Sequence, residues 1–216
     1  GELLRITGGR ERMMHDMNAR SDAPALTDER DALARVIHQR KNAFYGEVVR
    51  SARIELRGGV HDLMRECRER GVRMGIASTT SRSNVDALLR VHLGEQWNDW
   101  FAVIVCGEDV QLKKPDPEVF TLALQALDIC ALEAVAIEDS PGGVAAARAA
   151  EIPVIVTRSV YFADATIEGA IAIGPGLHQR EGWNPALRTG KGEPAGVGLD
   201  DIQDWRAQME TVSQFM

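Results

Sequence analysis

Apolar residues change their spacing along the chain near residue 56. Between residues 11 and 50 they recur every three or four positions, as one buried helix face requires, with a break at residues 21–24. From residue 56 onward, short runs of strand-forming residues alternate with helical segments. These runs span residues 73–77, 101–106, 134–137 and 153–156. The pattern therefore predicts helices first and an alternating α/β arrangement after them.

Helix-start signals lie between these runs. Asp116 precedes Pro117 and Ser140 precedes Pro141, so each pair places a capping side chain before a proline at the first helical position. Apolar strands separated by helices indicate a parallel sheet that is covered on both faces. We therefore predict an α/β fold with a Rossmann-like core, residues 56–174, preceded by a small helical domain, residues 1–55.

Residues 175–216 differ from both of these parts. They are rich in glycine and proline as far as Gly198, and then contain a predicted short helix over residues 200–211. We expect this segment, the C-terminal extension, to pack on the core.

Composition and charge exclude several classes of protein. The 216 residues are 44% hydrophobic and carry a net charge of -7 without a Lys/Arg-rich run, which argues against a nucleic-acid partner. No apolar run reaches the roughly 20 residues of a membrane span. The sparse cysteines show no Cys-x-x-Cys, as in proteins with reduced thiols, and the start lacks a secretion signal. We expect a cytoplasmic protein without a membrane partner; the sequence favours a monomer but leaves the oligomeric state open.

Polar residues follow the predicted strands at their carboxyl ends, where open parallel sheets bind ligands. The four hydroxyl residues 78–81 precede a helix and suit a phosphate, although they could simply cap that helix. Lys113 and Lys114 follow the second run and account for half of the lysines, the others being Lys41 and Lys191. A lysine fixed before a proline can present a compact positive charge to a cleft, and a solvated surface pair is the alternative.

Two adjacent carboxylates, Glu138 and Asp139, end the third run. Such a pair is costly to bury unless a cation compensates it, and Mg²⁺ prefers one or two carboxylates together with phosphate oxygens. Helix capping explains one of the two acids but not both. Hydroxyl, lysine and acid pair together indicate a site for a phosphoryl group held by magnesium.

Three motifs in this order resemble those of the haloacid dehalogenase superfamily. They are residues 75–79 (Gly-Ile-Ala-Ser-Thr), 114–120 (Lys-Pro-Asp-Pro-Glu-Val-Phe) and 137–147 (Ile-Glu-Asp-Ser-Pro-Gly-Gly-Val-Ala-Ala-Ala). The helical segment is similar to the small cap of the β-phosphoglucomutase-like branch. Residues 7–12 and 38–42 look most like the CbbY-type sugar-bisphosphate phosphatases.

The resemblance implies a role for each matching residue. Ser78 would hydrogen-bond a phosphoryl oxygen, Lys114 would stabilise its charge, and Asp139 with Glu138 would hold Mg²⁺. Other residues would contact the phosphosugar, unless those in the cap merely form a solvated helix face. They are Gly8, Gly9, Arg10, Arg12, His38 and Lys41 in the cap, and Thr79, Thr80 and Asn84 in the core.

One part of the family pattern is missing. The superfamily's nucleophile lies in an Asp-x-Asp motif at the end of a central strand, and no such motif follows an apolar run in these 216 residues. We therefore expect that strand to precede this chain in the functional protein. The resemblance implies a Mg²⁺-dependent phosphatase for a sugar bisphosphate of the xylulose-1,5-bisphosphate kind, acting through an aspartyl-phosphate. A phosphoglucomutase-type phosphotransferase and a non-catalytic phosphosugar-binding relative remain alternatives.

Overall fold

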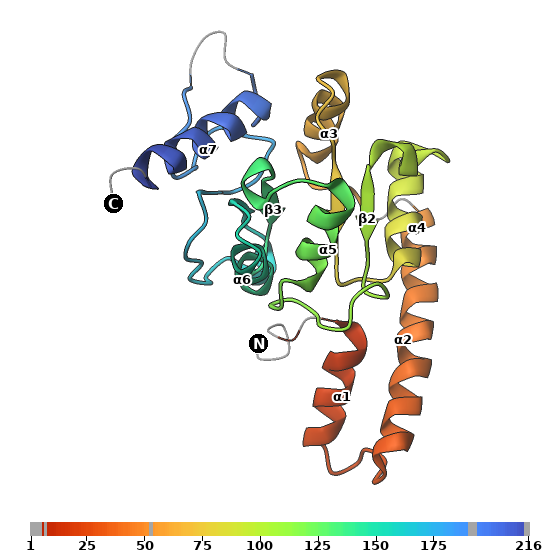
Figure 1. Ribbon diagram of the computed structural model, residues 1–216. Coiled ribbons are helices and arrows are strands. Elements are labelled where there is room, and N and C mark those ends of the chain that lie inside the picture. Colours follow the sequence, from red (N-terminus) through yellow and green to blue (C-terminus); the bar gives the residue numbers. More distant parts are fainter. Residues whose placement is uncertain (1–5, 7, 52–53, 190–193, 214–216) are drawn as a thin grey trace.

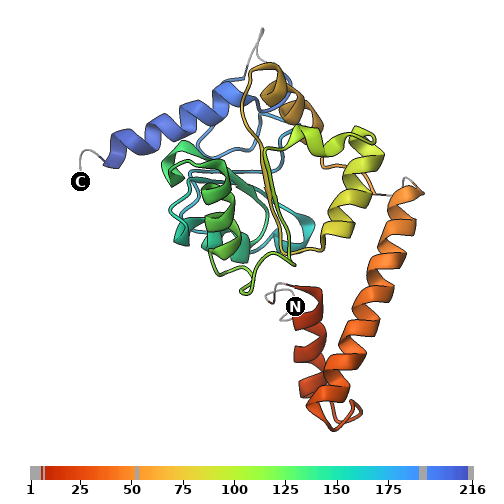
Figure 2. The same ribbon diagram turned by 45° about the vertical axis from the view of Figure 1, so that its right-hand side comes forward.

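The structure is a computed structural model. It describes the backbone of residues 6, 8–51, 54–189 and 194–213, and the side chains of these residues up to Met209. The predicted helices and strands follow each other in the expected order, with one additional strand near residue 173, and Figures 1 and 2 show them from two sides.

Two antiparallel helices form the first part of the structure. α1 (Gly9–Ala19) and α2 (Thr27–Arg50) lie side by side and project from the rest of the molecule, as Figures 1 and 2 show. The predicted break between them is confirmed. The far end of α2 packs on α4 (Arg82–Leu93) and buries Val49 there. The helical pair is thus fixed to the core along one helix.

The strands form two parallel sheets. β1 (Gly75–Ala77) pairs with β2 (Val103–Val105) in one sheet. β3 (Ala136–Glu138), β4 (Val154–Thr157) and β5 (Ala172–Gly174) form the other, in the order β3-β4-β5. The parallel α/β class is confirmed. β5 was not predicted, because three residues that end in a glycine carry too little pattern to reveal a strand.

Helices α3 (Val60–Glu69), α5 (Glu118–Leu127) and α6 (Pro141–Ala149) connect and cover the strands, with short 3₁₀ turns at Trp97–Trp100, Ala131–Glu133 and Val160–Phe162. The Ser140 hydroxyl accepts a hydrogen bond from Gly143 N at 3.1 Å, so the predicted cap of α6 is confirmed. α5 begins at Glu118, one residue later than predicted, while Asp116 accepts from Glu118 N at 2.9 Å, as the predicted capping residue would. The core lies between these helices and the fully buried strand β4.

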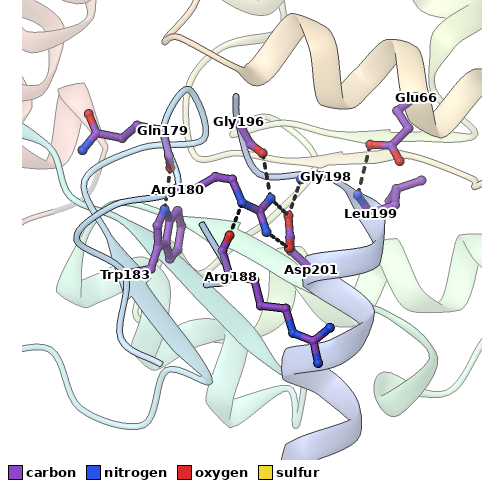
Figure 3. A network of polar contacts seen from close by, with 9 residues as sticks. All are labelled: Glu66, Gln179, Arg180, Trp183, Arg188, Gly196, Gly198, Leu199 and Asp201. Carbon is purple, nitrogen blue, oxygen red and sulfur yellow. Dashed lines mark hydrogen bonds and ion pairs between the residues drawn. The ribbon is translucent and has the colours of Figure 1, made fainter. Parts of the chain in front are cut away.

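The C-terminal extension packs on α3 and on the sheet formed by β3, β4 and β5. It ends in α7 (Leu199–Ser213), whose first residue donates from its backbone N to Glu66 Oε2 of α3 at 3.0 Å. Figure 3 shows the network behind this contact: Arg180 forms two 2.7 Å bonds with Asp201 and also donates to two backbone carbonyls. Trp183 stacks against Trp205 with ring centroids 4.8 Å apart. The division into three domains remains a prediction.

Candidate active site

The motif residues of the core meet at the carboxyl ends of the strands. Ser78 follows β1, Glu138 ends β3, and Lys114 reaches them from the loop after β2. Lys114 Nζ donates to the carbonyl of Ala77 at 2.9 Å and forms an ion pair with Glu138 Oε1. One ammonium group therefore links the end of β1 to the end of β3, across the two sheets.

Lys114 is held in this place by its surroundings. Its residue is only 8% exposed, and its Nζ lies 4.5 Å from the centroid of the Phe120 ring. Glu118 orders the preceding loop, since its carboxylate accepts from the backbone N of Gln111 and Leu112 at 3.0 and 2.6 Å, and these bonds lower its pKa. A buried charge of this kind needs a partner, and Glu138 provides it. The neighbouring Lys113 instead donates to the carbonyl of Gly107.

The Glu138 carboxylate is placed by the start of α6. Its Oε2 accepts from the backbone N of Asp139 at 3.2 Å and from the Ser140 hydroxyl at 3.5 Å. A Cβ at Gly143 would overlap this carboxylate, so only glycine lets the helix approach so closely. The positive end of the helix then favours the negative charge of Glu138. The sequence reasoning missed this role of Gly143, because adjacent glycine and alanine residues indicate only close packing.

The acid pair has the chemistry of a magnesium site. In the part of the chain that the structure describes, the Asp139 carboxylate accepts no hydrogen bond and forms no ion pair. No group of three or more His, Cys, Asp or Glu residues gathers among the described side chains. Mg²⁺ typically takes one or two carboxylates and completes its shell with water and phosphate oxygens. The two carboxylates, Glu138 nearly buried and Asp139 without a partner among the described residues, fit that ion.

The hydroxyl residues form a tight turn beside Lys114. Ser78 Oγ accepts from Thr80 N at 3.2 Å, which leaves its O–H free to donate, and Thr79 lies between them. The carbonyl of Thr80 accepts from Gly107 N at 2.7 Å, and a Cβ at Gly107 would press on this turn. The turn is therefore fixed by backbone contacts with the segment after β2, and it directly follows Ala77, whose carbonyl accepts from Lys114.

These hydroxyls do not cap α4, which was the alternative interpretation. No side-chain cap bond starts from Ser81, and the backbone N of Arg82 donates instead to both carboxylate oxygens of Glu108, at 3.2 and 3.1 Å. No local pattern predicts this contact, because Glu108 lies 26 residues further along the chain.

Three of the residues that were predicted to contact substrate from the helical cap domain come together. A Cβ on Gly9 would lie 2.9 Å from His38 Nδ1 and 3.2 Å from Lys41 Nζ, so the two side chains converge on the first turn of α1. Partial burial and the nearby Arg12 lower the pKa of Lys41. Burial, followed by the charge of Lys41, lowers the pKa of His38. Gly8 precedes the helix with a φ of 90°, a conformation that favours glycine.

The two arginines that the sequence left undecided have different surroundings. Arg10 forms an ion pair with Asp31 of α2, which lowers the pKa of that carboxyl. Arg12 donates to the carbonyl of Ile6 at 3.0 and 3.2 Å and lies close enough to Lys41 to affect its pKa. The fold thus brings both arginines near the cluster of His38 and Lys41, because Arg12 affects the pKa of Lys41 and Arg10 affects the pKa of His38.

Asn84 connects this cluster to the core. Its Nδ2 donates to Asn42 Oδ1 at 3.2 Å and to Thr80 Oγ1 at 3.1 Å, while Asn42 lies 3.3 Å from His38 Nε2. The predictions did not include Asn42, whose importance depends on the packing of α2 against α4. The core and cap candidates therefore belong to two clusters that Asn84 and Thr80 join.

This fold and this arrangement define a class of hydrolase. A family model for haloacid dehalogenase-like hydrolases matches residues 4–151, and the chain belongs to that family. Its class is that of the phosphoric monoester hydrolases. Within the family it belongs to the CbbY-like branch, as the following relatives show.

CbbY from Cupriavidus necator is 38% identical over 175 residues, which are 81% of this chain and 69% of that protein. CbbY from Rhodobacter capsulatus is 39% identical over 159 residues, 74% of this chain and 68% of that protein. A crystal structure of a CbbY variant from Rhodobacter sphaeroides, in complex with xylulose-1,5-bisphosphate, superposes with a TM-score of 0.75 at 35% identity, covering 81% of this chain and 76% of the other.

β-Phosphoglucomutase from Clostridium difficile also superposes, with a TM-score of 0.68 over 97% of this chain and 82% of the other. Because only 16% of its residues are identical, it shows the shared fold alone. Among the described helices, none combines the length and the apolar character that crossing a membrane would take.

Proposed function

We propose that this chain provides most of the active site of a Mg²⁺-dependent phosphatase for a small sugar bisphosphate, of the xylulose-1,5-bisphosphate kind. The observation that carries the proposal is the position of Lys114, buried between the Ala77 carbonyl and Glu138 and next to the turn that begins at Ser78. The CbbY relatives support the substrate class, since one was solved in complex with that bisphosphate.

In this proposal the core residues bind the phosphoryl group that is transferred. The Ser78 O–H donates to one of its oxygens, and the Lys114 ammonium stabilises the negative charge that grows on it. Asp139 and Glu138 hold Mg²⁺, which neutralises charge on the phosphoryl oxygens when bound. Thr79 lies in the same turn and lines the substrate side. Because Lys114 and Glu138 are fixed before substrate arrives, little reorganisation accompanies the reaction.

The nucleophile of the proposed reaction lies outside these 216 residues. β1 pairs only with β2 and β3 only with β4 among the described strands, so each has one open edge where a further strand fits. The first aspartate of the Asp-x-Asp motif on that strand attacks phosphorus, and the bond from phosphorus to the sugar oxygen breaks while the second aspartate gives that oxygen a proton. Water then gives a proton to the second aspartate and attacks the aspartyl-phosphate, releasing inorganic phosphate and restoring the first carboxylate.

The cap residues select the substrate in this proposal. Arg12, Lys41 and His38 hold the second phosphate or the sugar, over the backbone of Gly8 and Gly9. Arg10 is held on α2 by its ion pair with Asp31 and adds positive charge near His38. Closure of the helical pair over the core would exclude water from the reacting phosphate.

Phosphate release tests the proposal directly. The intact protein that carries this chain should release phosphate from xylulose-1,5-bisphosphate with Mg²⁺ and stop when EDTA removes the metal. Formation of a sugar-phosphate isomer without phosphate release would instead show a phosphoglucomutase. Tight binding with neither product would show a binding-only relative. The 216 residues alone should bind phosphate weakly and release none, since they lack the nucleophile.

A further inference from the structure

A row of four polar side chains joins the core turn to the cap. Asn84 of α4 donates from Nδ2 to Thr80 Oγ1 at 3.1 Å and to Asn42 Oδ1 at 3.2 Å. Asn42 of α2 places its Nδ2 3.3 Å from His38 Nε2. Asn84 is 6% exposed, so water does not compete for its amide. The row therefore connects the turn of hydroxyl residues at Thr80 with the cluster of His38 and Lys41.

The hydrogen bonds in this row run in one direction. A side-chain amide has separate donor and acceptor atoms, and Asn84 uses its NH₂ group toward both neighbours. Asn42 must then turn its oxygen to Asn84 and its NH₂ group to His38. His38 Nε2 can only accept in this arrangement. A neutral imidazole that accepts at one nitrogen carries its proton on the other, so the proton of His38 is on Nδ1.

His38 Nδ1 lies where a substrate group could use that proton. The atom is buried and has no hydrogen-bond partner among the described residues. It lies beside Gly9, and Lys41 Nζ approaches the same point from the next turn of α2. An N–H donor and an ammonium group therefore converge over the backbone of α1, as recognition of a phosphate or sugar hydroxyl requires.

We propose that Asn42 and Asn84 are positioning residues, which hold His38 as a neutral Nδ1–H donor in the phosphosugar site. The inference that His38 faces substrate rests on the proposed function, whereas the position of its proton does not. Asn84, which the sequence placed in contact with substrate, acts through His38 and Thr80 instead.

The charges around His38 also influence whether its ring takes up a second proton. Lys41 on α2 and Arg10 on α1 oppose protonation of the ring, while Glu11 on α1 and Glu108 after β2 favour it. Burial is the largest influence and opposes protonation. The Asn42 NH₂ group acts in the same sense, because a proton on Nε2 would put two donors face to face. The cap thus gains a hydrogen-bond donor at His38 without adding a positive charge.

Nitrogen NMR of the intact, ¹⁵N-histidine-labelled protein tests this inference, with the His38 signals identified by their loss in His38→Gln. In the wild type, at a pH where the ring is neutral, the proton should be on Nδ1. Asn42→Asp replaces the donor that faces Nε2 by an acceptor and still accepts from Asn84. The proton should therefore move to Nε2, and KM for the bisphosphate should rise about tenfold with kcat nearly unchanged, since one donor to substrate is lost.

Asn98→Asp is the matched control, because it adds the same charge at an exposed position of the Trp97–Trp100 turn. It should leave the proton on Nδ1. If Asn42→Asp does not fold, Asn84→Asp should give the same shift, since its carboxylate would turn the Asn42 oxygen toward His38. A wild-type proton on Nε2, or an unchanged tautomer in a folded aspartate variant, would overturn the inference. Failure of phosphate release would overturn the proposed function and leave the tautomer result standing.

Discussion

Two buried ion pairs, Arg180–Asp201 in the C-terminal extension and Lys114–Glu138 at the strand ends, show how one kind of contact serves two purposes. The Arg180 guanidinium meets Asp201 with two parallel bonds of 2.7 Å, and its other N–H groups reach backbone carbonyls. Each of the three guanidinium nitrogens of Arg180 has an acceptor in the protein, and Gly198 N donates to Asp201 as well. This pair can only stabilise the position of the extension.

The Lys114–Glu138 pair has similar burial but different surroundings. A single ammonium group contacts Glu138, and the pair borders a turn with a free Ser78 O–H and the unpartnered Asp139 carboxylate. Those groups are incompletely satisfied within the described protein, and a phosphate and a cation would satisfy them. Burial of charge alone does not distinguish a structural pair from an active-site pair, whereas the state of the neighbouring polar groups does.

Replacing Lys114 should have the largest effect. Lys114→Ala should lower kcat for phosphate release by about 10²- to 10³-fold, because a preorganised positive charge is removed from the transferred phosphoryl group. Steady-state kinetics of the intact protein measures this. Lys113→Ala is the control and should change kcat little, since the Lys113 ammonium contacts only backbone carbonyls among the described residues. Equal losses in both variants would contradict the role of Lys114.

Breaking the other pair should affect stability and spare the chemistry. Asp201→Ala leaves the Arg180 charge buried and should lower the free energy of unfolding by about 3–5 kcal/mol. Denaturant unfolding measures the loss, and kcat per folded molecule should be unchanged. Arg70→Ala breaks the exposed ion pair with Asp200 nearby and should change stability far less. A lower kcat in fully folded Asp201→Ala protein would contradict a purely structural role for the Arg180–Asp201 pair.

Gly143 offers a finer test of the site pair. Gly143→Ala should displace the Glu138 carboxylate and weaken Mg²⁺ activation about tenfold, because the new methyl group would overlap it. A titration of phosphate release against Mg²⁺ gives the shift. Ala145→Gly, at an exposed position of α6, alters helix propensity away from Glu138 and serves as control. An unchanged Mg²⁺ dependence in a folded Gly143→Ala protein would argue against Glu138 as a metal residue.

The smallest expected effect concerns pH and His38. Because folding lowers the pKa of His38 below its ordinary 6.5, the unfolded chain takes up the proton first as the pH falls. The stability that His38 contributes is therefore complete above about 6.5 and is lost as the pH falls through the folded-state value. Melting temperatures measured across this range should decline less in His38→Gln than in the wild type. His15→Gln, at an exposed position of α1, should follow the wild type.

The sequence by itself determined the class of fold and the core of the site. Helix periodicity, the proline-containing starts of α5 and α6, and the apolar strand runs are local signals, and the structure has those elements within a residue or a few. Ser78, Lys114, Glu138 and Asp139 each follow a predicted strand. Their meeting at one edge follows from the rule that parallel strands end on the same side of a sheet.

Only the tertiary structure decided the contacts between distant segments. The capping of α4 by Glu108, the amide row through Asn42 and Asn84, and the Arg180–Asp201 pair join residues 26, 42 and 21 positions apart. Such contacts leave no pattern along the chain, because each residue type is equally compatible with a solvated surface. They form once the helices and strands have packed and water has been excluded from their polar groups, and burial then determines which donor meets which acceptor.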